Sequence, residues 1–450
     1  MTLKYSNYLL FINKNKKYLI LLIIFFVFLL LRCWLLSKTI MFGWDQERDA
    51  QIAEKIISHS DIPLIGPRVV GEKGFFLGPY FFYLITPFYF LTNLHPYAIV
   101  YFVIFFSTIF YVISFYIFQK LYGFKVAMLF LAIWAVLPAT INQDRIAWNP
   151  MLIPLAFSTL IFYLDKFQLR PRYFLILGLI LGAIFHIHFQ GLFYAILALV
   201  YLMKKYPRSL RYYLWIILGF SLTFTPLIIF DFRHQWLNLN LFTNFFFSST
   251  HTSGSPISFL PVWSNFVDQL TGINNLVFSI IIWLILVIYG FINRRRAYFF
   301  TFTIVLFITP IAFAVYGQRP SEYYFNFLLP IIILYLSIFI SKKKIPPYIL
   351  LLIFSIFSLY SLKSIKINPT SLFYKNEIVK KAKDTLKETP VYISYDTPLG
   401  ENNGFDYLIN YYKINRSKDT SRPGVQFIIP KKDNLPSFGN ISLFIPEQFE

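Results

Sequence analysis

Long apolar runs recur along this chain, and short clusters of lysine and arginine separate them. Hydrophobic residues account for 57% of the 450 residues, and charged residues account for only 14%. A helix that crosses a bilayer needs about 20 mostly apolar residues, and runs such as Tyr18–Leu31, Val277–Ile292 and Ile331–Ile340 form the apolar centres of such helices. This pattern excludes an ordinary soluble domain and predicts a polytopic membrane protein.

The basic clusters indicate the orientation of the chain, because lysine and arginine accumulate in short cytoplasmic loops. Six clusters are present: Lys4, Lys14, Lys16 and Lys17; Lys120 and Lys125; Lys166, Arg170 and Arg172; Lys204, Lys205, Arg208 and Arg211; Arg294, Arg295 and Arg296; Lys342, Lys343 and Lys344. Placing all six in the cytoplasm requires eleven spans, with the N-terminus inside and the C-terminal tail outside. The predicted spans are 18–37, 97–118, 126–142, 150–164, 173–187, 189–203, 212–230, 273–292, 297–315, 323–340 and 345–362.

The net charge of +20 is therefore mainly an orientation signal, and it does not indicate binding to nucleic acid. The first apolar segment is long and no small-residue cleavage site follows it, so we expect a retained signal anchor. The single cysteine, Cys33, excludes an internal disulfide and a metal site built on cysteines. The lipid bilayer is the first expected partner of the chain.

Two long loops are expected on the outer side of the membrane, loop one at 38–96 and loop two at 231–272. In loop one, Ala53–Ser58 predicts an amphipathic helix, and the aromatic stretch Gly78–Tyr83 predicts an interfacial or re-entrant helix. In loop two, the Ser/Thr/Gly-rich segment Ser248–Ser255 predicts a mobile flap.

The tail differs abruptly in composition, with 13 basic and 10 acidic residues in 363–450. Its alternating segments Val391–Ser394 and Val425–Ile429 predict short strands. The predicted fold class is therefore an all-α polytopic membrane protein with about eleven transmembrane helices in residues 1–362. A small extracytoplasmic α/β or α+β domain follows in residues 363–450.

Acidic residues are rare in the membrane region, and they gather on one side of it. Outside the tail the chain holds eleven acids, and in the predicted topology all of them except Asp165 face outward. Three of them, Asp45, Glu47 and Asp49, lie within five residues just after the first span. A membrane protein that places its few carboxylates on one face is expected to bind or react there.

Several short motifs follow one another along the membrane region. They are Arg32, then Asp45–Ile52, Glu72-Lys73 with Gly78-Pro79-Tyr80, Asp144–Pro150, and Tyr323–Asn326 with Leu329-Pro330. In this order the chain resembles the integral-membrane GT-C glycosyltransferases. It is similar in particular to the family 39-like group of bacterial protein O-mannosyltransferase relatives and to the transferase that adds aminoarabinose to lipid A. The resemblance covers most of the membrane region and none of the tail.

The resemblance implies an inverting glycosyltransferase at the outer face of the cytoplasmic membrane. The donor would be a polyprenyl-phosphate sugar, and the acceptor would be a hydroxyl group of a lipid, a glycan or a protein. The chain departs from the family at Gln46, where Glu is usual, and at Asn149, where the aminoarabinose transferase has Asp. These departures leave the need for a divalent metal cation open.

Transfer from a phosphate leaving group needs a carboxylate base, cations for the phosphate and a groove for the lipid tail. Asp45 is the first candidate for the base and Glu47 is a second catalytic carboxylate, although Asp45 could instead cap the helix that follows it. Cations that could hold the donor phosphate are Lys73, Arg68, Arg145, Arg233 and Arg319, and of these Lys73, Arg145 and Arg319 are assigned to it. Trp44 and Trp148, beside the two acidic motifs, could stack on a sugar. The expected wall of the substrate cavity consists of Trp44, Asp49, Asp144, Asn149, His186, His188 and Tyr323.

His186 and His188 would lie roughly 200° apart on a helix, so we expect one of them in the cavity wall rather than both on one metal ion. Arg32 is expected to have a structural role, either reaching the interface or pairing with a loop acid.

Two other functions stay open. A transporter or flippase of lipid-linked sugars or polysaccharide would bury its charges near the middle of the membrane. The same fold could also have lost catalysis and serve as a scaffold for the tail.

Overall fold

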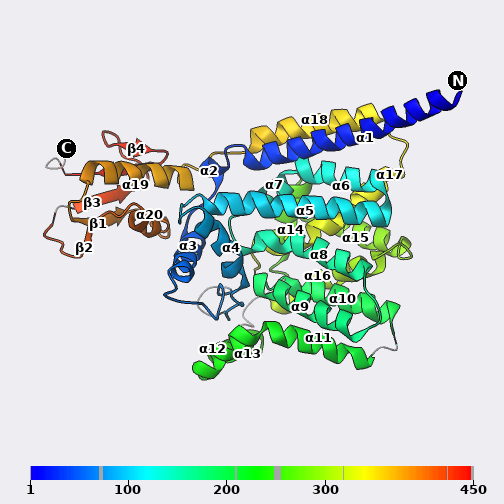
Figure 1. Cartoon of the computed structure of the whole chain (residues 1–450), viewed down its shortest axis with the longest axis horizontal. Helices are drawn as coiled ribbons and strands as arrows, with labels where there is room; N and C mark the ends of the chain where they lie inside the picture. Colours follow the sequence, from blue (N-terminus) through cyan, green and yellow to red (C-terminus); the bar gives the residue numbers. More distant parts are fainter. Residues whose placement is uncertain are drawn as a thin grey trace.

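The computed structural model describes residues 2–69, 74–207, 210–247, 255–317, 319–422 and 424–446. Most of these residues are helical, and Figure 1 shows a helical bundle with a small mixed domain at one end. Helices α3 and α4 of loop one lie between the bundle and this domain (Figure 1). The acidic cluster on α3 therefore lies at the end of the bundle that faces the tail (Figure 1).

All eleven predicted spans lie on helices. These helices are α1 (Thr2–Cys33), α5 (Ala98–Tyr122), α6 (Phe124–Val136) with α7 (Pro138–Arg145), α8 (Ile153–Asp165), α9 (Pro171–Ile187), α10 (Gly191–Lys205), α11 (Leu210–Thr223) with α12 (Thr225–Arg233), α15 (Leu276–Ile292), α16 (Phe299–Tyr316), α17 (Leu329–Ser341) and α18 (Pro347–Ser364). Short 3-10 helices precede two of them, η2 (Asn149–Leu152) before α8 and η4 (Glu322–Leu328) before α17. Within the described residues, four helices are long and apolar enough to cross a membrane, or up to seven spans if each bent pair counts as one. The number eleven stays a prediction.

The bent pairs arise where the backbone hydrogen-bond pattern is interrupted. The axis turns by 73° between α6 and α7 and by 58° between α11 and α12. Pro138 and Pro226 lie in the first turns of α7 and α12. Proline has no N–H to donate to the preceding turn, and its ring crowds that turn, which favours a bend. After the first bend, Arg145 of α7 contacts Leu31 at the end of α1, and after the second, Phe230 of α12 packs against Phe76 of loop one.

Loop one contains three helices, α2 (Leu36–Thr39), α3 (Trp44–Ile57) and α4 (Tyr80–Leu91). The predicted helix at Ala53–Ser58 is therefore only the end of a longer one. Gly43 is the N-cap of α3, and its N–H donates to the Gln46 side chain at 3.0 Å. Asp45 thus lies within the first turn and does not cap the helix, which leaves its carboxylate available for other contacts.

Loop two is also mostly helical. It contains α13 (Leu237–Phe247) and α14 (Leu260–Thr271), and α14 meets α15 at an angle of 75°. Residues 248–254 of the predicted flap lie outside the described part of the chain. The remainder of loop two packs against loop one and η4.

The tail forms a five-stranded mixed sheet with two helices. Its elements are α19 (Leu372–Leu386), β1 (Val391–Asp396), α20 (Phe405–Tyr411), β2 (Arg416–Ser417), β3 (Gly424–Ile428), β4 (Ser437–Phe438) and β5 (Ile441–Phe444). The strand order is β2-β1-β3-β5-β4, and β1 is parallel to both β2 and β3 while β5 is antiparallel to β3 and β4. Ile393 pairs with Val425 in the centre of this sheet. The predicted strands are therefore present.

Loop one and the tail share one hydrophobic core, in which Phe42 and Ala50 are buried together with Phe405 and Leu408. Polar contacts reinforce this core. The Glu47 carboxylate accepts backbone hydrogen bonds from Gly404 at 2.7 Å and from Tyr407 at 2.8 Å. The tail is thus attached directly to the helix that carries the acidic cluster.

Lys375 of α19 also joins the tail to loop one. Its buried ammonium donates to the carbonyl of Phe42 at 3.0 Å and to that of Glu401 at 3.3 Å. Burial lowers the pKa of Lys375 to about 8, although the nearby Glu47 opposes this shift. The buried ammonium and the buried carboxylate therefore bridge the tail and loop one from opposite sides.

A substitution at Gly404 can test how closely the tail approaches loop one. A Cβ atom at Gly404 would lie 2.2 Å from the Phe42 carbonyl oxygen, whereas a Cβ at Gly400 would have only an atom 3.9 Å away. Both glycines have positive φ, of 93° and 86°, so an alanine costs about 1–2 kcal/mol of backbone strain at either position. Gly404→Ala should lower the melting temperature of the purified protein more than Gly400→Ala does. It should also speed proteolytic release of the tail, and equal effects would contradict the close approach.

Candidate functional site

A cavity of about 600 Å³ opens between loop one and the ends of the helices beside it. Five parts of the structure contribute to its wall: α3, the hairpin before α4 (its paired arms are residues 66–69 and 74–77), η2, the turn after α9, and the chain from the end of α16 to η4. The residues that line it are Trp44, Asp45, Arg48, Pro67, Arg68, Val69, Leu77, Trp148, Asn149, Pro150, His188, Tyr316, Arg319, Ser321, Tyr323 and Tyr324. Six predicted site residues lie in this wall: Trp44, Asp45, Asn149, His188, Arg319 and Tyr323.

Arg48 organises the acidic cluster at the cavity. Its guanidinium contacts Asp45 at 2.7 Å and Asp49 at 2.6 Å. The Asp45 side chain is 31% exposed, whereas Asp49 is fully buried behind it and its Oδ2 atom has no hydrogen-bond partner. The cluster therefore presents one carboxylate to the cavity and keeps a second one behind the arginine.

Burial raises the pKa of Asp49 from its ordinary value of 3.8 to about 7, although the adjacent Arg48 opposes the shift. A smaller contribution in the raising direction comes from Asp45. Asp49 thus titrates near neutral pH in the folded protein.

Glu47 points away from the cavity. Its two carboxylate oxygens accept hydrogen bonds from the backbone at the start of α20, as described above. Burial raises the pKa of this carboxyl, and the two backbone donors oppose the shift. The geometry places Glu47 at the junction with the tail, and its predicted catalytic role has no support in the cavity wall.

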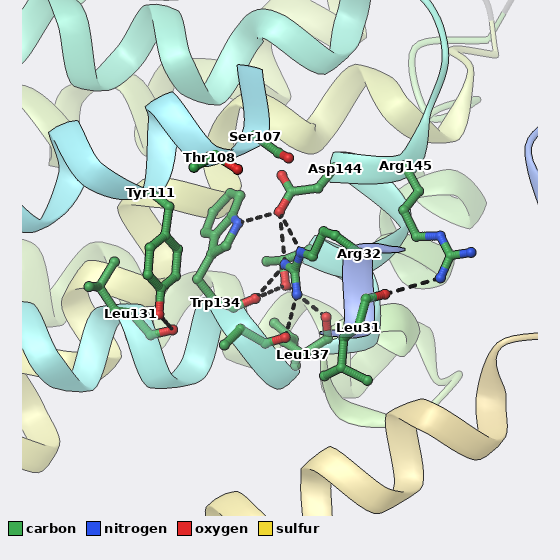
Figure 2. Close-up of polar contacts among 12 residues, drawn as sticks. Leu31, Arg32, Ser107, Thr108, Tyr111, Leu131, Trp134, Leu137, Asp144 and Arg145 are labelled. Atoms are coloured by element: carbon green, nitrogen blue, oxygen red, sulfur yellow. Dashed lines mark hydrogen bonds and ion pairs between the residues drawn. The ribbon is translucent and has the colours of Figure 1, made fainter. Parts of the chain in front are cut away.

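Asp144 and Arg32 form a buried ion pair outside this cavity (Figure 2). Arg32 donates to Asp144 Oδ2 at 2.8 and 3.0 Å, and the Trp134 indole donates to the same oxygen at 2.8 Å. Arg32 also donates to the carbonyls of Trp134 and Ala135. These carbonyls lie at the break before Pro138, where the helix cannot supply its own donors. The Asp144 carboxylate thus satisfies a buried cation, and Arg32 has the structural role expected of it.

Arg145 is directed to the other side of α7, toward the end of α1 (Figure 2). It donates to the carbonyls of Leu31 at 3.1 Å and Trp34 at 2.9 Å, and it also contacts the Thr39 hydroxyl. Arg145 therefore ties the first helix to α7 and contributes nothing to the cavity wall. Its predicted role as a phosphate ligand would require it to leave these partners.

A cluster of aromatic side chains forms the wall of the cavity at η2 and η4. The rings of Trp148 and Tyr323 meet edge to face with centroids 4.8 Å apart, and His188 lies 5.8 Å from Tyr323. Gln190 fixes this arrangement, since its side chain donates to the Tyr323 carbonyl at 3.0 Å and its N–H donates to His188 Nδ1 at 3.2 Å. Asn149 is held by the Ile187 carbonyl at 2.6 Å. The wall is thus preorganised by contacts behind it.

His186 is separated from His188 and lies outside the lining of the cavity. Its buried ring packs 4.2 Å from Tyr80 and 4.8 Å from Phe224. A Cβ atom at Gly78 would lie 1.7 Å from His186 Nδ1, which explains why glycine occupies that position. Among the residues that the structure describes, no three His, Cys, Asp or Glu side chains converge as metal ligands.

Three arginines line the cavity, and Asp45 is the only carboxylate among the described residues of its lining. Arg68 lies on the hairpin before α4, where it donates to the Gly74 carbonyl at 2.8 Å and stacks 5.2 Å from the Phe76 ring. Lys73 lies outside the described residues, and Arg319 follows α16. Arg68 was a candidate from the sequence for binding the phosphate and Trp148 was one for stacking on a sugar, whereas Tyr324 was not assigned to the site.

The buried ion pair predicts a large stability effect. Asp144→Ala would leave the Arg32 guanidinium buried without its counter-charge, which costs about 3–5 kcal/mol. Asp165, which pairs with the half-exposed Lys120, provides the matched control, because such a pair contributes about 1 kcal/mol or less. Thermal unfolding of the purified proteins should therefore show a much larger loss for Asp144→Ala than for Asp165→Ala. Similar losses would mean that the Arg32 pair is not important for stability.

The raised pKa of Asp49 predicts that the stability of the folded protein depends on pH. Between its ordinary pKa of 3.8 and about 7, the folded state retains a proton that the unfolded chain releases. The contribution of Asp49 to stability therefore falls as the pH rises through this window and levels off above it. Between about pH 4.5 and about pH 8, the melting temperature of Asp49→Asn should fall less than that of the wild type. The exposed Asp61 gives the control Asp61→Asn, and parallel curves for Asp49→Asn and wild type would contradict the assignment.

No protein-family model and no curated protein matches the sequence. Solved structures do match it. ArnT from Cupriavidus metallidurans, bound to undecaprenyl phosphate, superposes with a TM-score of 0.60 and 12% identity over 95% of this chain and 97% of ArnT. Its apo state gives 0.61 and 11% over 96% and 98%. The oligosaccharyltransferase AglB from Archaeoglobus fulgidus, with an inhibitory peptide and a dolichol-phosphate, gives 0.49 and 12% over 91% of this chain and 65% of AglB.

The likeness to ArnT covers 95% of this chain, so it extends into the tail, where the sequence motifs gave no resemblance. At this level of identity the superposition establishes the fold. The resemblance expected from the motifs is confirmed to that extent: this membrane protein has the fold of the GT-C glycosyltransferases.

Proposed function

We propose that this protein transfers a sugar from a polyprenyl-phosphate donor to an acceptor hydroxyl of a lipid, a glycan or a protein. The observation that carries the proposal is the cavity itself. It combines one partly exposed carboxylate, Asp45, with the arginines Arg48, Arg68 and Arg319. These are the two kinds of group that transfer from a phosphate requires. The ArnT structure of the same fold holds undecaprenyl phosphate, which supports this class of donor.

Asp45 is proposed as the general base. The acceptor oxygen attacks the anomeric carbon from the face opposite the phosphate, so the new carbon–oxygen bond forms as the bond to phosphate breaks. The proton of the hydroxyl passes to Asp45, and the configuration at the anomeric carbon is inverted. A base must reach the proton that it removes. Asp45 lines the cavity, whereas Glu47 and Asp49 do not.

Arg48 is proposed to orient the base. It holds Asp45 Oδ1 at 2.7 Å and is itself fixed by the buried Asp49. A carboxylate held in one orientation loses less conformational freedom when the acceptor binds. The buried carboxylate is thus a support for Arg48, and Arg48 is a support for Asp45.

Arg68 and Arg319 are proposed to bind the donor phosphate, with Lys73 as a further candidate from the sequence. The phosphate gains about one negative charge when the sugar leaves, and charge-assisted hydrogen bonds to arginine strengthen as that charge develops. The positive charge of Arg48 is balanced by Asp45, with which it forms an ion pair. Arg68 and Arg319 therefore supply the excess positive charge in the described wall.

Trp148 and Tyr323 are proposed to contact the sugar, with Trp44 at the rim. Trp44 is 68% exposed at the start of α3, whereas Trp148 and Tyr323 are packed together in the wall. The apolar face of a sugar ring packs well on an aromatic face, while Asn149 and His188 beside them offer polar contacts to hydroxyl groups.

The basic clusters orient this cavity toward the outer face of the cytoplasmic membrane, with the N-terminus in the cytoplasm and the tail outside.

The proposal predicts the behaviour of Asp45→Asn. Purified wild-type and variant proteins would be reconstituted with labelled polyprenyl-phosphate hexose and an extract of lipids and glycans from the source organism. Loss of a general base lowers turnover by about 10²–10⁴-fold, so transfer of label should fall by that factor in Asp45→Asn. The control Asp61→Asn removes an exposed carboxylate of loop one outside the cavity and should keep wild-type transfer.

Equal turnover of donor by wild type and Asp45→Asn would remove Asp45 from the role of base. Donor that is never transferred but crosses the bilayer in a flipping assay would favour the transporter function instead.

A further inference from the structure

Asn238, the second residue of α13, makes a paired contact with the backbone of the hairpin before α4. Its Oδ1 accepts from the Phe76 N–H at 2.7 Å, and its Nδ2 donates to the Phe76 carbonyl at 3.2 Å. The two residues are 162 positions apart, and the Asn238 side chain is buried. A side-chain amide can satisfy both the N–H and the carbonyl of one residue, since it carries a donor and an acceptor.

Asp231 fixes Asn238 in turn. Its carboxylate accepts from the N–H of Asn238 at 2.6 Å and from that of Leu239 at 3.1 Å. These are orphan donors of the first turn of α13, so Asp231 stabilises the start of that helix. The amide of Asn238 is therefore held by a capped helix rather than by a free loop.

Phe76 lies directly across the hairpin from Arg68. The two residues form an antiparallel bridge, and the Arg68 guanidinium stacks 5.2 Å from the Phe76 ring. Backbone bonds from Val69 to Phe75 at 2.9 Å and from Leu77 to Pro67 at 3.0 Å hold the two arms together. A shift of Phe76 would therefore be transmitted to Arg68.

The same hairpin supplies one of the three arginines of the described cavity wall together with three apolar residues. Pro67, Arg68, Val69 and Leu77 all line it. Phe245 of α13 is buried against Val69 and Leu77, so α13 contacts the hairpin through apolar residues as well as through Asn238. Asn238 adds a polar contact to these apolar ones, and it joins the start of α13 to the backbone of the hairpin.

We propose that Asn238 is a positioning residue for donor binding, because it holds Phe76 and thereby presents Arg68 to the phosphate of the polyprenyl donor. This inference rests on the proposed function. Asn238 itself lies outside the cavity lining and touches no substrate. Its loss would let the hairpin shift, which weakens phosphate binding in the ground state and weakens it further in the transition state, where the phosphate gains charge. We therefore expect KM to rise and kcat to fall as well.

The test measures binding of polyprenyl phosphate alone to the purified full-length protein, by calorimetry, together with kcat and KM for sugar transfer. Asn238→Ala should weaken binding of polyprenyl phosphate about tenfold and raise KM by a similar factor. Asn238→Asp, which can accept from the Phe76 N–H but cannot donate to its carbonyl, should lie between Ala and wild type. The exposed neighbour Asn240 gives the control Asn240→Ala, which should bind as the wild type does.

A double variant separates positioning from general destabilisation. If Asn238 acts through Arg68, the variant that carries both Arg68→Ala and Asn238→Ala should bind polyprenyl phosphate no more weakly than Arg68→Ala alone. Additive losses, or wild-type affinity in Asn238→Ala, would overturn the inference while leaving the proposed function in place. Failure of the wild type to bind polyprenyl phosphate would overturn the proposed function and the inference together.

Discussion

The contact between the Glu47 carboxylate and the start of α20 is the interaction on which the arrangement of the site depends. It joins α3 to the tail through two backbone hydrogen bonds of 2.7 and 2.8 Å. The same helix carries Asp45 into the cavity, so the position of the proposed base is set partly by a domain that does not line the cavity. Burying a carboxylate without such donors would be costly. The tail and the acidic cluster therefore depend on each other.

Helical geometry separates the three acids of the cluster. Successive residues on an α-helix are about 100° apart, so Asp45 and Asp49 lie about 40° apart and Glu47 lies on the opposite face. This explains why one arginine, Arg48, can contact both aspartates while Glu47 faces the tail. The sequence contained this information once the helix was known to begin at Trp44. Glu47 was nevertheless assigned to the catalytic site, as a substitute for the glutamate that is usual at position 46.

Other parts of the site could not be predicted from the sequence, because they depend on distant partners. The predicted spans and strands follow from local periodicity, and they coincide with helices and strands of the structure. Arg32 and Asp144 are 112 positions apart, and their pairing depends on carbonyls exposed at the break before Pro138. Nothing local distinguishes Asp144 from a cavity acid. The same holds for Arg145, whose acceptors belong to α1 and α2.

The shared core of loop one and the tail has a consequence for how such proteins can be recombined. The composition changes near residue 363, which suggests a place to exchange one tail for another. The core, however, continues across that point, from Phe42 and Ala50 to Phe405 and Leu408. A foreign tail would meet an apolar surface and a buried carboxylate shaped for different partners. Any exchange between relatives would therefore have to carry at least α2 and α3 together with the tail, which would transfer the proposed base as well.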